Sequence, residues 1–154
     1  MLDRNQDAGR GMTSATQAFM RTMAAVLCLL AVTACDEKSP SSVTAVVDQR
    51  FTLAQGQVAL VAGTGVRLQF VSVSGDSRCP ADAICIQGGD AIVHVRAFEG
   101  ESQRDYELHT GDSRQAVAVH GGLRIELVEL QPFPFSSRAI RSDEYRATLL
   151  VTRV

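Results

Sequence analysis

The side chains best suited to chemistry in this sequence are a carboxylate beside a guanidinium, and three imidazoles. Asp76 lies two residues before Arg78 in a segment rich in turn-forming residues. Short polar side chains in loops usually bond to nearby groups, so we expect Asp76 to cap a turn and Arg78 to pair with it. His94, His109 and His120 each occupy a polar position of an alternating segment. On neighbouring strands these imidazoles could bind Zn²⁺ or Cu²⁺, although solvated surface histidines are the commoner outcome.

Other patterns typical of metal binding or catalysis are incomplete. Asp76, Asp82 and Asp90 could supply loop oxygens to Ca²⁺, but their spacing matches no established calcium loop. The sequence contains no Gly-x-Ser-x-Gly turn, no His-Glu-x-x-His zinc motif and no glycine-rich phosphate loop. We therefore predict no catalytic residue, no cofactor and no metal ligand.

A proline-stiffened segment, 131–140, contains two of the six phenylalanines, Phe133 and Phe135. Proline lowers the entropy that a loop loses on binding, and exposed aromatic rings favour contact with a partner. Buried aromatic rings are nevertheless commoner than exposed ones. We therefore expect both rings to fold back as a lid over one end of the domain, with a partner-binding loop as the alternative.

The composition limits the class of protein. Of the 154 residues, 45% are hydrophobic and 21% are charged, which is typical of one folded domain and excludes disorder along the whole chain. The 15 basic and 17 acidic residues give a formal net charge of −2, and the basic residues are scattered. Because phosphate binding requires a basic face, we exclude nucleic acid as a partner.

The elements that position these side chains are short segments of alternating polar and apolar residues, separated by glycine-containing turns. Such alternation places one set of side chains on a core face and predicts β-strands. The clearest strands are 66–71, 91–96, 105–109, 123–127 and 145–152, with weaker ones at 51–53, 57–61 and 115–119. About eight strands at regular spacing predict an all-β fold. We expect a single antiparallel β-sandwich over residues 51–154, immunoglobulin-like in its general architecture.

The N-terminal part of the chain has the pattern of an export signal. An apolar run, 23–32, follows Arg21 and is shorter than the about 20 residues needed to cross a bilayer. The run leads into Val32-Thr33-Ala34-Cys35, which resembles the bacterial lipobox, where an aliphatic and two small residues precede a lipid-modified cysteine. The resemblance implies that residues 1–34 form a signal peptide region and that Cys35 carries a lipid. The alternative is a plain secretory signal with a chance cysteine.

Two further features refine this prediction. Residues 1–19 are polar and unlike the start of a signal peptide, which favours a true start at Met20. Residues 35–50 are then the lipidated cysteine and a polar linker. Asp36 resembles the signal that retains lipoproteins in the inner membrane, so we expect a lipid-anchored location on that membrane, facing the periplasm, rather than on the outer membrane.

The lipoprotein interpretation determines what happens to the four cysteines. Cys28 would be removed with the signal and Cys35 would carry the lipid, which leaves Cys79 and Cys85 in an oxidising compartment. We therefore predict a disulfide between these two. Five residues separate them, unlike the two-residue gap of thioredoxin-like redox motifs. The disulfide is accordingly interpreted as structural.

The same segment contains a distinctive motif. Asp-Ser-Arg-Cys-Pro at 76–80, followed by Cys85-Ile86, Gly89 and Ala91, resembles a pattern found in small secreted proteins and lipoproteins of bacteria, most of them uncharacterised. Gln87 stands where tryptophan is common in that pattern. The likeness extends loosely over residues 51–154 and implies a shared fold, without implying an activity.

Together these patterns predict a membrane-anchored bacterial lipoprotein with a non-catalytic binding module. The expected partner, besides the membrane bound through Cys35, is another envelope protein or a glycan. The candidate binding surfaces are the segment containing Asp76 and Arg78 and the segment containing Phe133 and Phe135. The alternative is a metal-binding or enzymatic envelope domain that uses the three histidines or Asp76 with Arg78.

Overall fold

The structure of this chain is a computed structural model that describes residues 42–154. The expected signal region, residues 1–34, lies outside the described residues. The same holds for Cys35 and for residues 36–41 of the expected linker.

Residues 42–154 form nine strands and one 3₁₀ turn, η1 (Ser142–Glu144). The strands are β1 (Val43–Ala45), β2 (Arg50–Ala54), β3 (Val58–Val61), β4 (Val66–Ser74), β5 (Ile92–Glu99), β6 (Ser102–His109), β7 (Val117–His120), β8 (Leu123–Gln131) and β9 (Arg146–Arg153). No helix in this part of the chain has the length and apolar character needed to cross a membrane.

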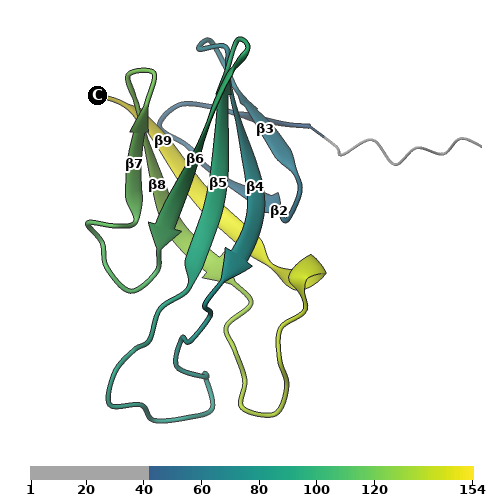
Figure 1. The fold of residues 1–154 in the computed structure, drawn as a ribbon, viewed down its shortest axis with the longest axis vertical. Coiled ribbons are helices and arrows are strands. Elements are labelled where there is room, and N and C mark those ends of the chain that lie inside the picture. The colour runs from purple at the N-terminus through teal and green to yellow at the C-terminus, as the bar shows by residue number, and fades with distance from the viewer. Residues whose placement is uncertain (1–41) are drawn as a thin grey trace, which may run out of the picture. The chain divides into compact units, whose positions relative to one another are not determined.

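The strands form two sheets that pack into a sandwich (Figure 1). One sheet has the order β1-β3-β4-β5-β6 and the other has the order β2-β9-β8-β7. All pairings are antiparallel except that of β1 with β3, which is parallel. The predicted all-β sandwich is confirmed, and each of the eight predicted strands corresponds to one of β2 to β9.

Strand β1 was not predicted, and it lies within the range 35–50 for which a linker was expected. Three residues are too few to establish an alternating pattern. The segment becomes a strand because it pairs with β3, where Val43 lies opposite Ala59.

The core follows from the alternation of side chains along the strands, because every second residue faces the opposite sheet. The outward positions between them hold polar residues such as Arg67, Gln69 and Arg96, which are partly or fully exposed. The largest fully buried side chains are Leu53, Val61, Val66, Leu68, Phe70, Val93, Val95, Leu108, Ile125, Leu149 and Val151.

Strand β8 departs from simple alternation at a bulge. Its register with β9 shifts between Leu127 and Glu129, so Val128 is the extra residue. The shift allows Leu127 and Leu130, three positions apart, both to be buried. Strand β8 also extends beyond β7, which pairs with it only over Leu123–Glu126.

The longest connections gather at one end of the sandwich. The β4–β5 connection, residues 75–91, and the segment between β8 and η1, residues 132–141, both extend from the lower end in Figure 1. The tips of the β5–β6 and β7–β8 hairpins lie at the opposite end. The lower end therefore holds all four residues of the candidate binding surfaces.

Candidate functional site

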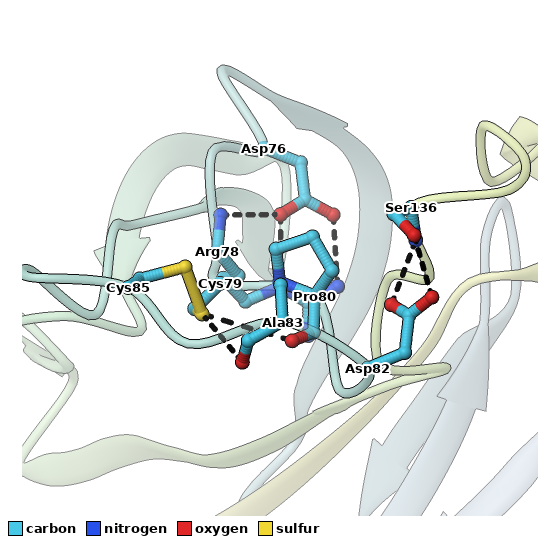
Figure 2. The surroundings of a disulfide bond; sticks show 8 residues. All are labelled: Asp76, Arg78, Cys79, Pro80, Asp82, Ala83, Cys85 and Ser136. Atoms are coloured by element: carbon cyan, nitrogen blue, oxygen red, sulfur yellow. Dashed lines mark hydrogen bonds and ion pairs between the residues drawn. A yellow bond between two sulfur atoms is a disulfide. The ribbon is translucent and has the colours of Figure 1, made fainter.

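The site is built around a nearly buried ion pair in the β4–β5 connection. Oδ1 of Asp76 accepts hydrogen bonds from Nε and the backbone N–H of Arg78, at 2.9 and 3.3 Å. Oδ2 lies 2.8 Å from Nη2 of the same guanidinium. Only 8% of the Arg78 side chain and 12% of the Asp76 side chain are exposed. The expected turn and pair are thus both present (Figure 2).

The ion pair also binds two segments that are distant in the sequence. The Arg78 guanidinium donates hydrogen bonds to the backbone carbonyls of Leu130, at the end of β8, and Pro132. The Tyr145 hydroxyl, immediately before β9, donates to Oδ2 of Asp76 at 2.9 Å. No sequence pattern indicated a role for Tyr145 beyond that of a core residue. The pair therefore joins the β4–β5 connection to both β8 and β9.

The pKa values of the two acidic groups move in opposite directions. Burial raises the pKa of Asp76, but the hydrogen bonds from Arg78 and Tyr145 and the charge of Arg78 outweigh it, so the pKa falls below its usual value. Burial, followed by the hydrogen bond to Asp76 and the charge of that carboxylate, raises the pKa of Tyr145 to about 12. At neutral pH the network is therefore an ionised carboxylate, a guanidinium and a neutral hydroxyl.

The predicted disulfide between Cys79 and Cys85 is confirmed, with the two Cα atoms 6.0 Å apart. The Cys79 N–H also donates to the Gly88 carbonyl at 2.8 Å, and this bond joins the two ends of the loop that contains the disulfide. Gly89 has a φ of +69°, and a Cβ atom there would lie 1.8 Å from the Ser77 carbonyl oxygen. The loop backbone therefore requires glycine at this position.

The disulfide loop, residues 79–89, and the loop that holds Phe133 and Phe135, residues 131–137 (the Pro-Phe loop), lie against each other. The Ala81 N–H donates to the Pro134 carbonyl at 2.8 Å. The Asp82 carboxylate accepts the Ser136 N–H at 2.9 Å and the Ser136 hydroxyl at 2.5 Å (Figure 2). The sequence offered no sign of this contact, since neither Asp82 nor Ser136 belongs to a pattern that links the two loops.

The expected lid over the end of the sandwich is not formed. Phe133 and Phe135 are 49% and 52% exposed and do not belong to the buried core. The Phe133 ring lies beside the Arg78 side chain, whose guanidinium carbon is 5.9 Å from the centre of the ring. Arg78 also binds the Leu130 and Pro132 carbonyls, which positions the backbone at the start of the Pro-Phe loop.

Two aliphatic side chains on the disulfide loop are even more exposed. Ile84 and Ile86 have relative accessibilities of 104% and 105%, so nothing in the described part of the chain covers them. They flank Cys85, which the disulfide attaches to the rest of the loop. We call Ile84, Ile86, Phe133 and Phe135 together the apolar loop end.

The structure does not bring the three histidines together. The His94 ring lies 2.7 Å from the Ser74 hydroxyl, the His109 ring 2.6 Å from the Asp90 carboxylate, and the His120 ring 3.0 Å from the Tyr106 hydroxyl. Within residues 42–154 no group of three His, Cys, Asp or Glu side chains is arranged to hold a metal ion.

The three aspartates considered for Ca²⁺ are also separate. Asp76 binds Arg78, Asp82 binds Ser136, and Asp90 binds His109. Each carboxylate thus has its own partner. The polar groups of the site bond to one another and hold the two loops in place. The loops can therefore present their exposed apolar side chains in a fixed arrangement.

Replacing Arg78 should destabilise the protein strongly. In Arg78→Ala the Asp76 carboxylate would remain largely buried without its cation, and we expect the free energy of unfolding to fall by about 3 kcal/mol. The matched control is Arg138→Ala, because Arg138 pairs with Glu144 at 2.8 Å but its side chain is 58% exposed. Urea unfolding of both variants measures the difference, and a similarly small loss in both would contradict the structural role of Arg78.

The raised pKa of Tyr145 predicts a loss of stability at alkaline pH. An unfolded tyrosine ionises at about pH 10, whereas native Tyr145 ionises at about 12. Its contribution is therefore complete below pH 10 and is lost as the pH rises to about 12. We expect the free energy of unfolding of the wild type to fall more steeply over this interval than that of Tyr145→Phe. Parallel urea titrations test this, and equal slopes would exclude the effect.

No protein-family model, no curated protein and no solved structure matches the chain.

Proposed function

We propose that this protein is a membrane-anchored bacterial lipoprotein and that its β-sandwich is a non-catalytic module that binds another envelope protein. The apolar loop end is the proposed contact surface. The observation that supports this proposal most directly is the contact between two loops that each expose two large apolar side chains. Exposed apolar groups concentrated in one region of a folded domain are typical of interaction sites.

The parts of the two loops that present the apolar side chains are nearly free of charge. Residues 79–89 contain one charged residue, Asp82, and residues 131–137 contain none. The Asp82 carboxylate is bonded to Ser136. Because charged side chains are depleted at the centre of protein interfaces, this composition suits burial against a partner.

A protein partner fits the loop better than a hydrocarbon phase does. Within the described residues, the backbone N–H groups of Ile84, Cys85 and Ile86 donate no hydrogen bond. Hydrocarbon cannot satisfy such groups, whereas the backbone of a partner can. A protein also suits the two isoleucines better than a glycan, because a branched aliphatic side chain offers no flat face to a sugar ring.

The loops are fixed before any partner arrives. The disulfide, the Asp82–Ser136 contact and the Asp76–Arg78 pair all restrain them. A preorganised surface loses little conformational entropy on binding, so more of the contact energy appears as affinity.

The proposed anchor is a lipid on Cys35. The seven residues 36–42 separate this cysteine from β1. A chain spans at most about 3.5 Å per residue. The lipid would therefore keep the sandwich within roughly 30 Å of the membrane surface, with the inner membrane, facing the periplasm, as the proposed location.

Lipidation can be tested on the full chain expressed in a bacterial host. We expect the wild type to label with radioactive palmitate and to partition into the detergent phase of a Triton X-114 extraction. Cys35→Ser should neither label nor partition there, whereas Cys28→Ser should behave as the wild type. An unlabelled wild type in the aqueous phase would refute the anchor without bearing on the loop end.

The contact surface can be tested by affinity capture from cross-linked envelopes, followed by binding measurements with the purified partner. Ile84→Ser combined with Ile86→Ser should weaken binding by about tenfold or more, because exposed apolar anchors lose their buried contacts. The matched control, Leu60→Ser with Val119→Ser, alters side chains that are 45% and 57% exposed elsewhere on the sandwich. A partner that binds both double variants equally well would rule out the apolar loop end as its site.

A further inference from the structure

A second candidate site lies on the side of the sandwich, where β8 continues past β7. Strand β7 pairs with β8 only over Leu123–Glu126, whereas β8 runs to Gln131. A cleft of about 590 Å³ lies next to the part of β8 that β7 leaves uncovered. Its lining includes His109, at the end of β6, and Phe133.

The cleft exposes the backbone edge of β8. Five consecutive residues, Glu126 to Leu130, line it. Successive side chains of a strand point to opposite faces except at a bulge, and the bulge at Val128 disturbs this order only locally. A run of five lining residues therefore indicates that the backbone edge of β8 contributes to the cleft.

Two hydrogen bonds identify the groups on this edge. The Leu127 N–H donates to the Ala116 carbonyl at 2.8 Å, and the Leu130 carbonyl accepts from Arg78. The N–H and C=O of one strand residue point to the same side. The Leu127 carbonyl and the Leu130 N–H therefore also face the cleft, where the pairing of β7 with β8 has already ended at Glu126. No loop or side-chain hydrogen bond within residues 42–154 involves either group.

Glycines form part of the remaining lining of the cleft. These are Gly88, Gly89 and Gly111, and a Cβ atom added at Gly88 would meet nothing within 4 Å. An added strand lies about 4.8 Å from its neighbour, and such close approach needs a wall without bulky groups. The cleft is thus open to an extended chain between Ala116 at one end and Arg78 at the other.

Two glutamates, Glu126 and Glu129, line the cleft. Glu126 lies 3.1 Å from Arg124. Glu129, which is exposed, receives a hydrogen bond only from the neutral Gln131 amide, at 2.7 Å, and no cation of the described chain pairs with it. A basic side chain on an occupant would complement this carboxylate.

We infer that the cleft binds an extended peptide segment, which adds as a strand to the open edge of β8 and places a lysine or arginine beside Glu129. Backbone hydrogen bonds to Leu127 and Leu130 would determine the direction and register of the peptide. This site is separate from the proposed function, since it requires neither the lipid nor the two isoleucines of the apolar loop end.

The test uses the full chain and a fluorescein-labelled hexapeptide, Lys-Val-Thr-Val-Thr-Lys, in fluorescence anisotropy titrations. Saturable binding is expected. Two further peptides have N-methyl groups on alternate amides, one on the odd positions and one on the even positions. Only one set of amides faces β8 in an added strand, so one methylated peptide should bind at least about tenfold more weakly and the other about as well as the parent.

Charge reversal tests the role of Glu129. Glu129→Lys should weaken binding of the lysine peptide by about threefold and strengthen binding of its glutamate counterpart, Glu-Val-Thr-Val-Thr-Glu. Glu107→Lys is the control, because Glu107 is an exposed acid on β6 with 65% of its side chain accessible. The control should change neither affinity.

Three results would overturn the inference. The first is the absence of saturable binding of either peptide by folded protein. The second is an equal effect of both methylation patterns, which would show that no strand is added. The third is loss of peptide binding in the Ile84→Ser, Ile86→Ser variant, which would place the peptide on the apolar loop end; that variant should bind the peptide normally.

Discussion

The arrangement of this protein's loop end depends on one nearly buried ion pair, Asp76 with Arg78. A guanidinium with 8% of its side chain exposed must have its charge and its donors satisfied. Asp76 neutralises the charge, and the Leu130 and Pro132 carbonyls accept the remaining hydrogen bonds. Hydrogen bonds are directional, so the groups that bond to the Arg78 guanidinium must take fixed positions. One side chain thereby positions the β4–β5 connection, the end of β8 and the Pro-Phe loop.

The contribution of this pair is geometric more than energetic. The desolvation of two charges offsets much of their attraction, so a buried pair adds little free energy relative to an apolar replacement. The pair instead determines where the neighbouring backbone segments lie. Arg78 binds the Pro132 carbonyl, directly before Phe133, and the Phe133 and Phe135 side chains lie at the surface. The same side chain bounds the cleft beside β8 by capping the Leu130 carbonyl.

The two proposed binding sites make different demands on the fold. The apolar loop end uses side chains presented by loops, and the sandwich below it serves only as a support. The cleft uses the backbone of β8 itself, and it exists because β7 ends early. An unpaired strand edge invites pairing with another chain. Here the uncovered stretch is bounded by Ala116 and Arg78, which limits it to a short segment.

Most of the strand arrangement was predictable, because alternation along one strand already specifies which side chains face the core. Strands β4, β5, β8 and β9 are long enough for this pattern to be unambiguous. Strand β1 was missed because three residues cannot show a period, and its pairing partner β3 lies elsewhere in the sequence. The lid over the sandwich end was expected wrongly, because the position of Phe133 depends on a side chain more than fifty residues away.

The amino-acid sequence by itself determined the features whose partners are close along the chain. The all-β class follows from a two-residue period, and the bond between Asp76 and Arg78 spans two positions. Only the tertiary structure decided the contacts between segments: Arg78 to Leu130 spans 52 positions, Asp82 to Ser136 spans 54, and Asp76 to Tyr145 spans 69. The physical reason is that a local bond needs only the conformation of a few residues. A contact between distant loops forms only after the two sheets have packed and brought their ends together.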